Sequence, residues 1–330
     1  MVVIVSIGIT IVKHVVGDYI LIYIIYIIIY YLNKMSDHNN NKKQQQQQQQ
    51  RSDNVVVGCI MEAPEFMRDN CYIKSGYLMN CHTITTACKC ALMLHNETIN
   101  IWSHLLGTIF TIILVIYTII CIEVDTNDLS KVPLFIMLFS AFLCLTFSTA
   151  YHLLCPISIN INTVLSRFDY AGISLLIAGS CYPPYSYFFH CEPFLRGAYL
   201  TFITVFAVSV FVFTLTPNFH SPQHRTLRGT LFLALGISAG IPIIHLMLFG
   251  DGVKGFVGKP RFEFWYVGGI SYIAGALMYI ERVPERFYPG RFDIFGASHQ
   301  WFHLCVVIGV VSHFIGSLDA LWFRMEHWCK

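Results

Sequence analysis

Residues 132–154 read VPLFIMLFSAFLCLTFSTAYHLL, an apolar run that contains no Asp, Glu, Lys or Arg. A helix needs about 20 apolar residues to cross the roughly 30 Å of hydrocarbon in a bilayer, so this run is long enough. The backbone inside a bilayer must satisfy its own hydrogen bonds, and the sequence shows no alternating pattern of the kind that membrane β-strands carry. We therefore expect residues 132–154 to form a membrane-spanning helix.

Six further apolar runs of spanning length accompany this one. They cover approximately residues 101–122, 169–189, 195–215, 227–249, 264–280 and 301–323. The connections between the runs are short and polar, which leaves no room for a second globular domain. The sequence thus predicts an all-α fold, a seven-transmembrane helix bundle, in which Pro183, Pro184 and Pro242 should kink or loosen two of the helices.

The composition also indicates an integral membrane protein. Of the 330 residues 55% are hydrophobic and 12% are charged, whereas soluble domains carry about 25% charged residues. The formal net charge of +2 is small and the Lys and Arg are dispersed, which argues against a nucleic-acid partner. The 12 cysteines include no CxxC pair and several lie in apolar runs, so we expect neither a disulfide framework nor a thiolate metal site.

The chain outside the spans varies in character. Residues 1–35 form an apolar amino-terminal segment without a small-residue cleavage site, and the segment is an extra span, a signal anchor or of doubtful coding origin. Residues 36–54 are rich in Asn and Gln and predict a disordered low-complexity linker. Residues 55–98 are expected to form a short pre-membrane region with a little helix. The membrane domain takes residues 99–324 and leaves a short tail, residues 325–330.

Four ionisable residues stand at the ends of predicted spans, where charge is costly and invites a functional explanation. His152 ends the second span, Asp169 opens the third, and His299 and His303 open the seventh. An odd-numbered span begins on the side where an even-numbered span ends, so all four lie at one membrane face. His299 and His303 are four residues apart, which places their Cβ atoms about 6 Å apart on one helical face. These side chains can converge.

Three neutral imidazoles and a water make a zinc arrangement of the open, catalytic kind. Under this hypothesis zinc binds His152, His299 and His303, while Asp169 orients the water and accepts its proton as the zinc lowers the pKa of the water. Ser148 lies one turn before His152 and can hydrogen-bond the water, a substrate carbonyl or a ligand imidazole.

The same residues allow other interpretations. A histidine pair near a helix end can lie at the membrane interface without binding a metal. A haem bound by two histidines is another alternative, but it would leave Asp169 without a role. Three further histidines fit the cluster poorly. His245 is expected to pack beside Pro242, and both His104 and His313 lie apart from the group.

A series of motifs runs along the chain. They are NETINIWSHLLG (96–107), LCLTFS (143–148) followed by His152, FDYAG (168–172), PQHRTLR (222–228), GIPIIH (240–245), VPERFYPGRFD (283–293) and SHQWFH (298–303). With these motifs the chain resembles the progestin and adipoQ receptor family, related to haemolysin III proteins. It looks closest to the adiponectin-receptor branch of that family, from about Asn96 to Gly316.

The resemblance implies a topology and a metal. Lys and Arg flank the two membrane faces almost equally, so charge alone does not orient the bundle. The family has its amino terminus in the cytosol and its carboxyl terminus outside, which would place residues 55–98 in the cytosol. The resemblance also implies Zn²⁺ on the positions that match His152, His299 and His303, with water between the metal and Asp169.

The resemblance further implies an activity. Family members look like lipid hydrolases that share a Ser-x3-His, Asp and His-x3-His pattern with alkaline ceramidases, and the implied reaction is hydrolysis of a sphingolipid amide. Asp169 would act as general base and Ser148 would support the substrate carbonyl. The expected partners are a membrane lipid (ceramide, sphingoid base or free fatty acid), an extracellular protein or steroid ligand, and cytosolic signalling partners.

Two hypotheses of function remain open at this point. The first is a receptor-like, zinc-dependent amidohydrolase acting on ceramide or a similar lipid, in the plasma membrane, the Golgi or the endoplasmic reticulum. The second is a signalling receptor or scaffold in which the zinc is purely structural. A transporter is less favoured, because the spans show neither a repeated half nor a line of charged residues.

Overall fold

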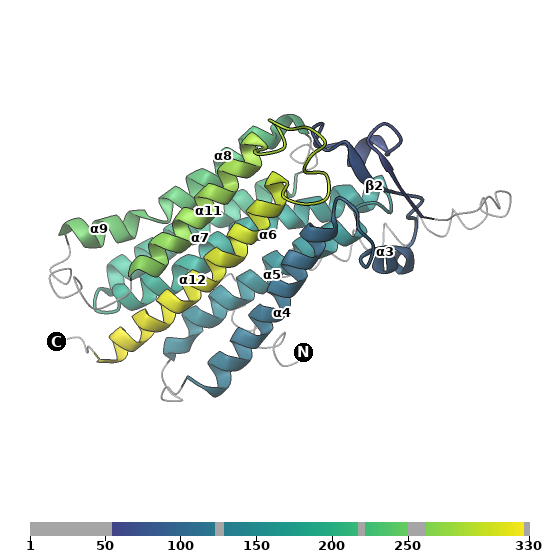
Figure 1. The fold of residues 1–330 in the computed structure, drawn as a ribbon. Coiled ribbons are helices and arrows are strands. Elements are labelled where there is room, and N and C mark those ends of the chain that lie inside the picture. Colours follow the sequence, from purple (N-terminus) through teal and green to yellow (C-terminus); the bar gives the residue numbers. More distant parts are fainter. Residues whose placement is uncertain (1–54, 123–128, 217–221, 250–261, 327–330) are drawn as a thin grey trace.

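The structure is a computed structural model that describes residues 55–122, 129–216, 222–249 and 262–326. Its long helices run side by side as a bundle, with a small cap of strands and loops at one end (Figure 1). The helices of the bundle are α4 (Thr98–Ile120), α5 (Val132–Leu154), α6 (Ile159–Phe188), α7 (Pro193–Thr214), α8 (Arg225–Ser238), α9 (Ile241–Phe249), α11 (Phe262–Glu281) and α12 (Ser298–Glu326). The predictions for residues 1–35 and 36–54 lie outside the described residues.

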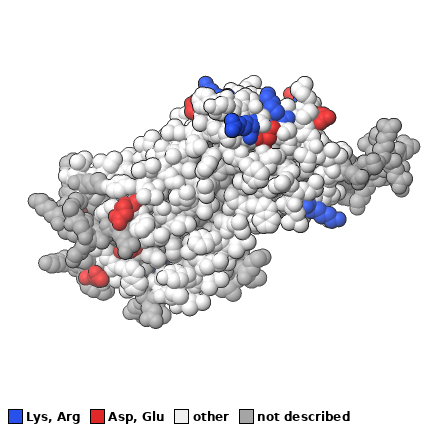
Figure 2. All heavy atoms as spheres, viewed as in Figure 1, with Lys and Arg blue, Asp and Glu red and all other residues white. Residues whose placement is uncertain are grey.

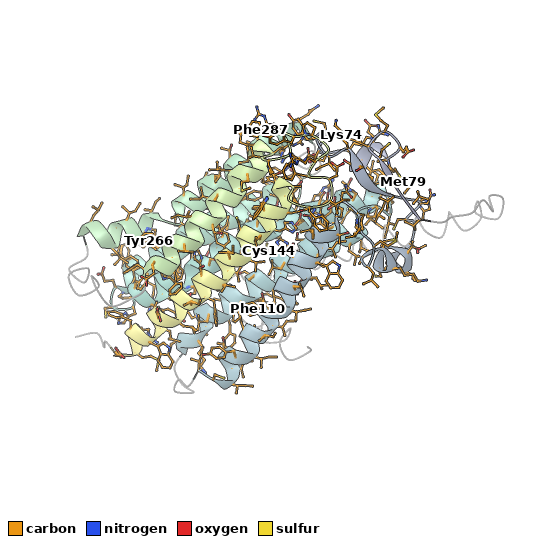
Figure 3. The ribbon with its side chains drawn as sticks, in the orientation of Figure 1. Lys74, Met79, Phe110, Cys144, Tyr266 and Phe287 are labelled. Carbon is orange, nitrogen blue, oxygen red and sulfur yellow. The ribbon has the colours of Figure 1, made fainter. Side chains whose placement is uncertain are left out.

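Each of the seven predicted spans is helical in the structure, with α8 and α9 sharing the fifth. Five helical stretches of the described ranges can cross a membrane by length and composition alone, one of them Arg225–Leu246 across the α8–α9 junction. The outer surface is apolar, as on α4, where Ile109, Phe110 and Ile113 are exposed (Figure 3). The all-α bundle and its integration in a membrane are therefore confirmed.

Two proline positions behave differently. Pro242 stands at the second residue of α9, directly after the helical path breaks at Ala239 and Gly240. The carbonyl of Ala239 accepts a hydrogen bond of 2.7 Å from the hydroxyl of Tyr185, which satisfies an acceptor at the break. By contrast, α6 continues through its proline pair to Phe188.

The third span begins earlier than predicted. Ser158 caps α6 by accepting a hydrogen bond of 3.3 Å from the backbone N–H of Ile161, so the helix starts at Ile159. Asp169 consequently lies ten residues inside α6 and does not open it. Hydropathy missed the first turns because they are polar, as in Asn160 and Asn162.

The centre of the bundle is a packed contact between three helices. Its buried residues come from α5, α6 and α12 and are Ala141, Cys144, Leu145, Leu176, Val306 and Val310. This contact fixes the end of α5 against the start of α12. The relative placement of His152 and the two α12 histidines follows from it.

The cap is built from the pre-membrane residues and the loop before α12. It contains an antiparallel pair, β1 (Val56–Cys59) and β2 (Ser75–Met79), and the short helix α3 (Ile84–Cys90). Helix was expected there and is present, whereas the strands were missed because they are short and mixed in composition. The carboxylate of Asp293 accepts hydrogen bonds from the Lys74 backbone N–H and the Ser75 hydroxyl, at 2.9 and 2.6 Å.

Lys and Arg side chains gather at the cap end of the molecule together with some Asp and Glu (Figure 2). A few acidic side chains lie at the opposite end, and the helical surface between the two ends is nearly uncharged in this view. At the opposite end, between α6 and α7, Cys191 is disulfide-bonded. Ten other cysteines of the described ranges are free, whereas Cys191 belongs to a disulfide that the sequence analysis did not anticipate. A single pairing at a helix connection leaves no CxxC signature.

Candidate metal centre

Three histidines converge at the cap end of the bundle. His152 comes from the last turn of α5, and His299 and His303 come from the first two turns of α12. The Nε2 atom of His299 lies 3.1 Å from Nε2 of His152 and 3.1 Å from Nε2 of His303. All three offer a ligand atom within 4.8 Å of one another.

A carboxylate fixes the orientation of the His152 ring. The Nδ1–H of His152 donates a hydrogen bond of 2.8 Å to Oε2 of Glu97, the residue before α4. The side-chain amide of Asn100 donates to the same oxygen at 2.6 Å. Burial is the largest single influence and works to raise the pKa of the Glu97 carboxyl, but the hydrogen bonds from His152 and Asn100 and the charge interactions with His152 and His299 together lower it to about 2. Glu97 is therefore ionised at neutral pH, and the lone pair of His152 Nε2 points to the cluster.

The first turns of α4 hold His303 in the same way. Its Nδ1–H donates to the backbone carbonyl of Asn100 at 3.2 Å, and the Ser103 hydroxyl lies 3.1 Å from the same nitrogen. The His104 ring stacks on the His303 ring with centroids 3.6 Å apart and planes 5° apart. With Nδ1 engaged, Nε2 of His303 is free to act as an acceptor or a ligand.

This donor set fits a zinc ion. Imidazoles bound to one zinc at about 2.0–2.1 Å in tetrahedral geometry have their nitrogens roughly 3.3 Å apart, close to the observed separations. Metal-bound histidines usually donate their other ring N–H to a carboxylate or a backbone carbonyl, and His152 and His303 do so here. Because Nδ1 of His152 and of His303 is already hydrogen-bonded, Nε2 of each ring is available to bind a metal ion.

An apolar cavity of about 450 Å³ adjoins the cluster. His299 and His303 line it, together with Asp169 and Ser148. The hydroxyl oxygen of Ser148 is buried and makes no close hydrogen bond, but it interacts with the carboxyl group of Asp169. Two of the three histidines, His299 and His303, thus face a cavity that also receives the carboxylate of Asp169 and the hydroxyl of Ser148.

The structure brings together all five residues that the sequence singled out: Ser148, His152, Asp169, His299 and His303. It also adds four residues that the sequence analysis missed: Glu97, Asn100, Ser103 and His104. Their spacing of three and four residues places most of them on one face of a helix, a signal that was present in the NETINIWSHLLG motif.

The other histidines also have defined places. His104 was expected to lie apart from the cluster, and its stacking on His303 corrects that prediction. His245 bonds to the hydroxyl of Tyr199, in agreement with a packing role. His313 lies apart from the three-histidine group but lines the same cavity.

Comparison with known proteins shows the family of the chain. Residues 92–314 match the haemolysin-III-related family. The chain is 34% identical to the adiponectin receptor protein of Drosophila melanogaster over 264 residues, which cover 80% of this chain and 59% of that protein. It is 34% identical to heptahelical transmembrane protein 1 of Arabidopsis thaliana over 279 residues, 81% of this chain and 82% of that protein.

A nematode protein is similar as well. The progestin and adipoQ receptor-like protein 1 of Caenorhabditis elegans is 33% identical over 266 residues, 81% of this chain and 61% of that protein. The chain thus spans less than two thirds of the length of the fly and nematode relatives. The matched family, the helical bundle and these relatives together lead to one conclusion: the chain belongs to the haemolysin-III-related family, as an adiponectin-receptor-like integral membrane protein.

Proposed function

We propose that the chain is a zinc-dependent hydrolase of lipid amides such as ceramide, with the ion held by His152, His299 and His303. One observation carries this proposal: the histidine cluster borders an apolar cavity that Asp169 and Ser148 also line. Structural zinc sites are closed by four protein ligands, whereas catalytic sites leave one position open. Because three histidines would leave one position of the zinc ion open toward the cavity, a catalytic zinc site is favoured over a structural one.

A zinc ion held by these histidines would supply a Lewis acid for the hydrolysis of an amide. The carboxylate of Asp169 would accept a proton from the attacking water molecule and return it to the leaving amine. The hydroxyl of Ser148 lines the same cavity beside Asp169 and would donate a hydrogen bond to the amide carbonyl as negative charge develops there.

The walls of the cavity suit a lipid. A volume of about 450 Å³ lies within the range of small-molecule sites, and the lining between the polar groups is largely aliphatic and aromatic, as at Leu176, Ile177 and Phe302. Apolar walls hold an acyl chain and keep bulk water from the reacting bond. The lipid class would be ceramide or a related amide, with a free fatty acid and a sphingoid base as products.

We place the histidine cluster at the cytosolic face. Cys191 supports this orientation because it is disulfide-bonded at the opposite end of the bundle, between α6 and α7. Disulfides persist in oxidising compartments, outside the cell or in the secretory lumen. The cap and residues 55–98 would then be cytosolic, and α12 would end on the outer side, in the plasma membrane, the Golgi or the endoplasmic reticulum.

A second candidate is a signalling receptor or scaffold with a structural zinc ion. The names of the fly and nematode relatives, an adiponectin receptor protein and a progestin and adipoQ receptor-like protein, favour it. Such a protein would bind an extracellular protein or steroid ligand and act on cytosolic signalling partners. It would require the metal for stability and not for turnover.

Metal analysis and lipid turnover of the purified full-length chain separate the two candidates. The hydrolase requires about one zinc per chain and release of fatty acid from ceramide, both lost when His152, His299 and His303 are all replaced by Ala. Stoichiometric zinc without release of fatty acid from any lipid amide would support the receptor and contradict the hydrolase. A chain that binds no zinc would contradict both.

A further inference from the structure

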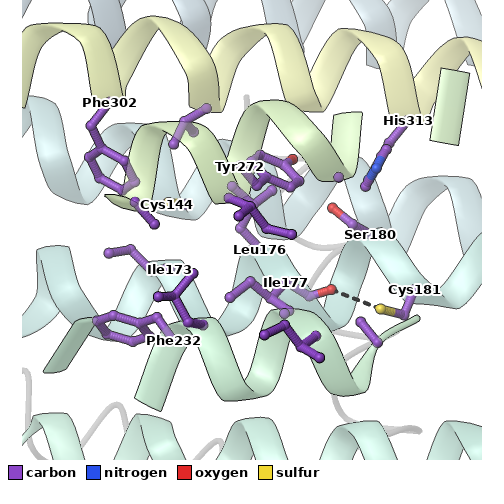
Figure 4. A pocket seen from close by; sticks show the side chains of 18 of the residues that line it. Cys144, Ile173, Leu176, Ile177, Ser180, Cys181, Phe232, Tyr272, Phe302 and His313 are labelled. Carbon is purple, nitrogen blue, oxygen red and sulfur yellow. Dashed lines mark hydrogen bonds between the residues drawn. The ribbon is translucent and has the colours of Figure 1, made fainter. Parts of the chain in front are cut away.

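The cavity has a second polar end, far from the histidine cluster. Ser180 on α6, Tyr272 on α11 and His313 on α12 line it there. Figure 4 shows these three side chains gathered on one side, while Phe302 and Cys144 mark the other side. The proposed chemistry uses none of the three, so their presence in an otherwise apolar space needs an explanation.

The polar atoms of this second end have few partners. The Ser180 hydroxyl, the Tyr272 hydroxyl and Nδ1 of His313 are buried and make no close hydrogen bond to any described residue. The two hydroxyls interact with each other, and the His313 ring interacts with the backbone of Trp265. Ser180 is only 3% exposed. Polar groups buried without a partner cost free energy, so they are usually paired with protein, water or a ligand. Three such atoms around one space indicate that something bound there completes them.

The packing of α11 against α12 holds two of these side chains in place. A Cβ atom on Gly268 would lie 2.2 Å from Cδ2 of His313, and a Cβ on Gly309 would lie 2.3 Å from Cε1 of Tyr272. Each ring therefore occupies a space that only glycine leaves open on the facing helix. The two rings meet edge to face, with centroids 5.2 Å apart and planes at 90°. Their polar atoms are presented by a rigid contact, which lowers the entropy cost of binding.

The helices give the distance between the two polar ends. His303 and His313 are ten residues apart on α12, which corresponds to about 15 Å at 1.5 Å per residue. Asp169 and Ser180 on α6 give a similar value of about 16 Å. An extended hydrocarbon chain with C–C bonds of about 1.5 Å advances roughly 1.3 Å per carbon. A chain of roughly 12 carbons therefore connects the ends.

We propose that Ser180, Tyr272 and His313 form a second binding site, which takes a hydroxyl or carbonyl oxygen on the lipid chain roughly 12 carbons from the group at the histidine cluster. The two hydroxyls can donate or accept, and the imidazole adds a donor or an acceptor, so the site pairs with either kind of oxygen. The inference rests on the proposed function in one respect, that a lipid chain fills the cavity. It adds that the cavity prefers lipid chains that carry a hydroxyl or carbonyl group over chains that carry neither.

The test compares two fatty acids on the purified full-length protein. The probes are stearic acid and its analogue with a hydroxyl roughly 12 carbons from the carboxyl group, and the dissociation constant of each is measured calorimetrically. The wild type should bind the hydroxylated acid about threefold to tenfold more tightly, as one or two net hydrogen bonds allow. Tyr272→Phe and Ser180→Ala should each reduce that ratio toward one, because each removes a single oxygen.

Ser174→Ala is the matched control. Ser174 is on the same helix as Ser180 and is buried, but its hydroxyl donates 2.8 Å to the carbonyl of Ala171 and does not line the cavity. This variant should keep the preference of the wild type. A preference that survives in both Tyr272→Phe and Ser180→Ala, or is missing in the wild type, overturns the second site.

The same experiment keeps the two proposals apart. If the wild type binds both acids equally, the second site is wrong and the hydrolase proposal stands. If it binds the hydroxylated acid preferentially but releases no fatty acid from ceramide, the hydrolase proposal is wrong and the second site stands. If neither acid binds, a lipid-filled cavity is wrong and both fall. Since the wild-type comparison is decisive, a variant that fails to fold does not weaken the test.

Discussion

Glu97 and His152 are 55 residues apart in sequence, and Oε2 of the first accepts a 2.8 Å hydrogen bond from Nδ1 of the second. The carboxylate belongs to the residue before α4, and the imidazole belongs to the last turn of α5. Because this bond holds the proton on Nδ1, it directs the Nε2 lone pair of His152 toward His299. Glu97 therefore orients one residue of the histidine cluster without being one of the three proposed metal ligands.

Replacement of this carboxylate should weaken metal binding. Glu97→Gln keeps the size of the side chain but loses the charge, and we expect a 10–100-fold lower zinc affinity, the usual effect of losing such a partner. Competition with a chelator of known affinity measures it. Glu281→Gln, on an exposed carboxylate that pairs with Arg286, is the control and should bind zinc as the wild type does. Equal affinities in both variants would show that Glu97 does not support the ligand.

Removal of zinc should destabilise the fold. A ligand present at about 100 times its Kd stabilises the native state by about 2.7 kcal/mol, so a strong chelator should lower the melting temperature of the wild type. The variant with all three histidines replaced should melt lower from the start and show no response to the chelator. Thermal unfolding in detergent, followed by fluorescence, gives both values. A chelator response in the triple variant would place the metal elsewhere.

The carboxylate of Asp169 should affect the rate of hydrolysis but neither zinc binding nor thermal stability. Asp169→Asn removes a proton acceptor but adds no volume, so lipid amide hydrolysis should fall by about 10²–10⁴-fold while zinc content and melting temperature stay near those of the wild type. Glu263→Gln changes an exposed carboxylate at the start of α11 and should leave the rate unchanged. Wild-type rates in Asp169→Asn would exclude it as the general base.

The hydroxyl of Ser148 should contribute less to the rate of hydrolysis than the carboxylate of Asp169 does. Ser148→Ala deletes a buried hydroxyl that interacts with Asp169 but makes no close hydrogen bond, so the stability of the fold should change little. If the hydroxyl stabilises negative charge on the carbonyl, kcat should fall by about 10²–10³-fold with little change in KM. Steady-state kinetics on one ceramide separate the two constants. A rise in KM alone would instead assign Ser148 to ground-state binding.

The cap should stabilise the start of α12. The buried carboxylate of Glu285 accepts hydrogen bonds from the backbone N–H of Ser298 at 2.7 Å and from the side chain of Asn70 at 3.0 Å. Glu285→Ala leaves these donors unpaired, and the stability should drop by about 1–3 kcal/mol. Glu285→Gln should recover part of it, because one acceptor remains. Chemical denaturation of the three proteins provides the comparison, and identical midpoints would contradict a role for the cap.

The sequence predicted the bundle well, because long apolar runs such as residues 132–154 have few alternatives to a membrane helix. It also placed His152 with His299 and His303, since the direction of successive helices decides which ends share a face. It missed the start of α6 at Ile159, where polar residues hide the helix from hydropathy.

Other features could not be predicted from spans alone. Glu97 precedes the first span, so its bond to His152 depends on how the chain enters the bundle. The stacking of His104 on His303 depends on the rotation of α4 about its own axis, which apolar runs do not determine. The strands β1 and β2 lack a strong pattern, and the pairing of Cys191 lacks a local motif.

The hydrogen bonds of Glu97 and Glu285 bear on how the protein can be shortened. Each carboxylate stands outside the membrane helices, yet one orients a ring of the metal centre and the other holds the backbone of the residue before His299. A truncated protein that starts at Thr98 would keep every residue of α4–α12 and lose both Glu97 and Asn70. Such a fragment would retain all three imidazoles, but His152 would lose the carboxylate that orients its ring and Glu285 would lose its Asn70 donor, so a shortened protein should keep the cap together with the bundle.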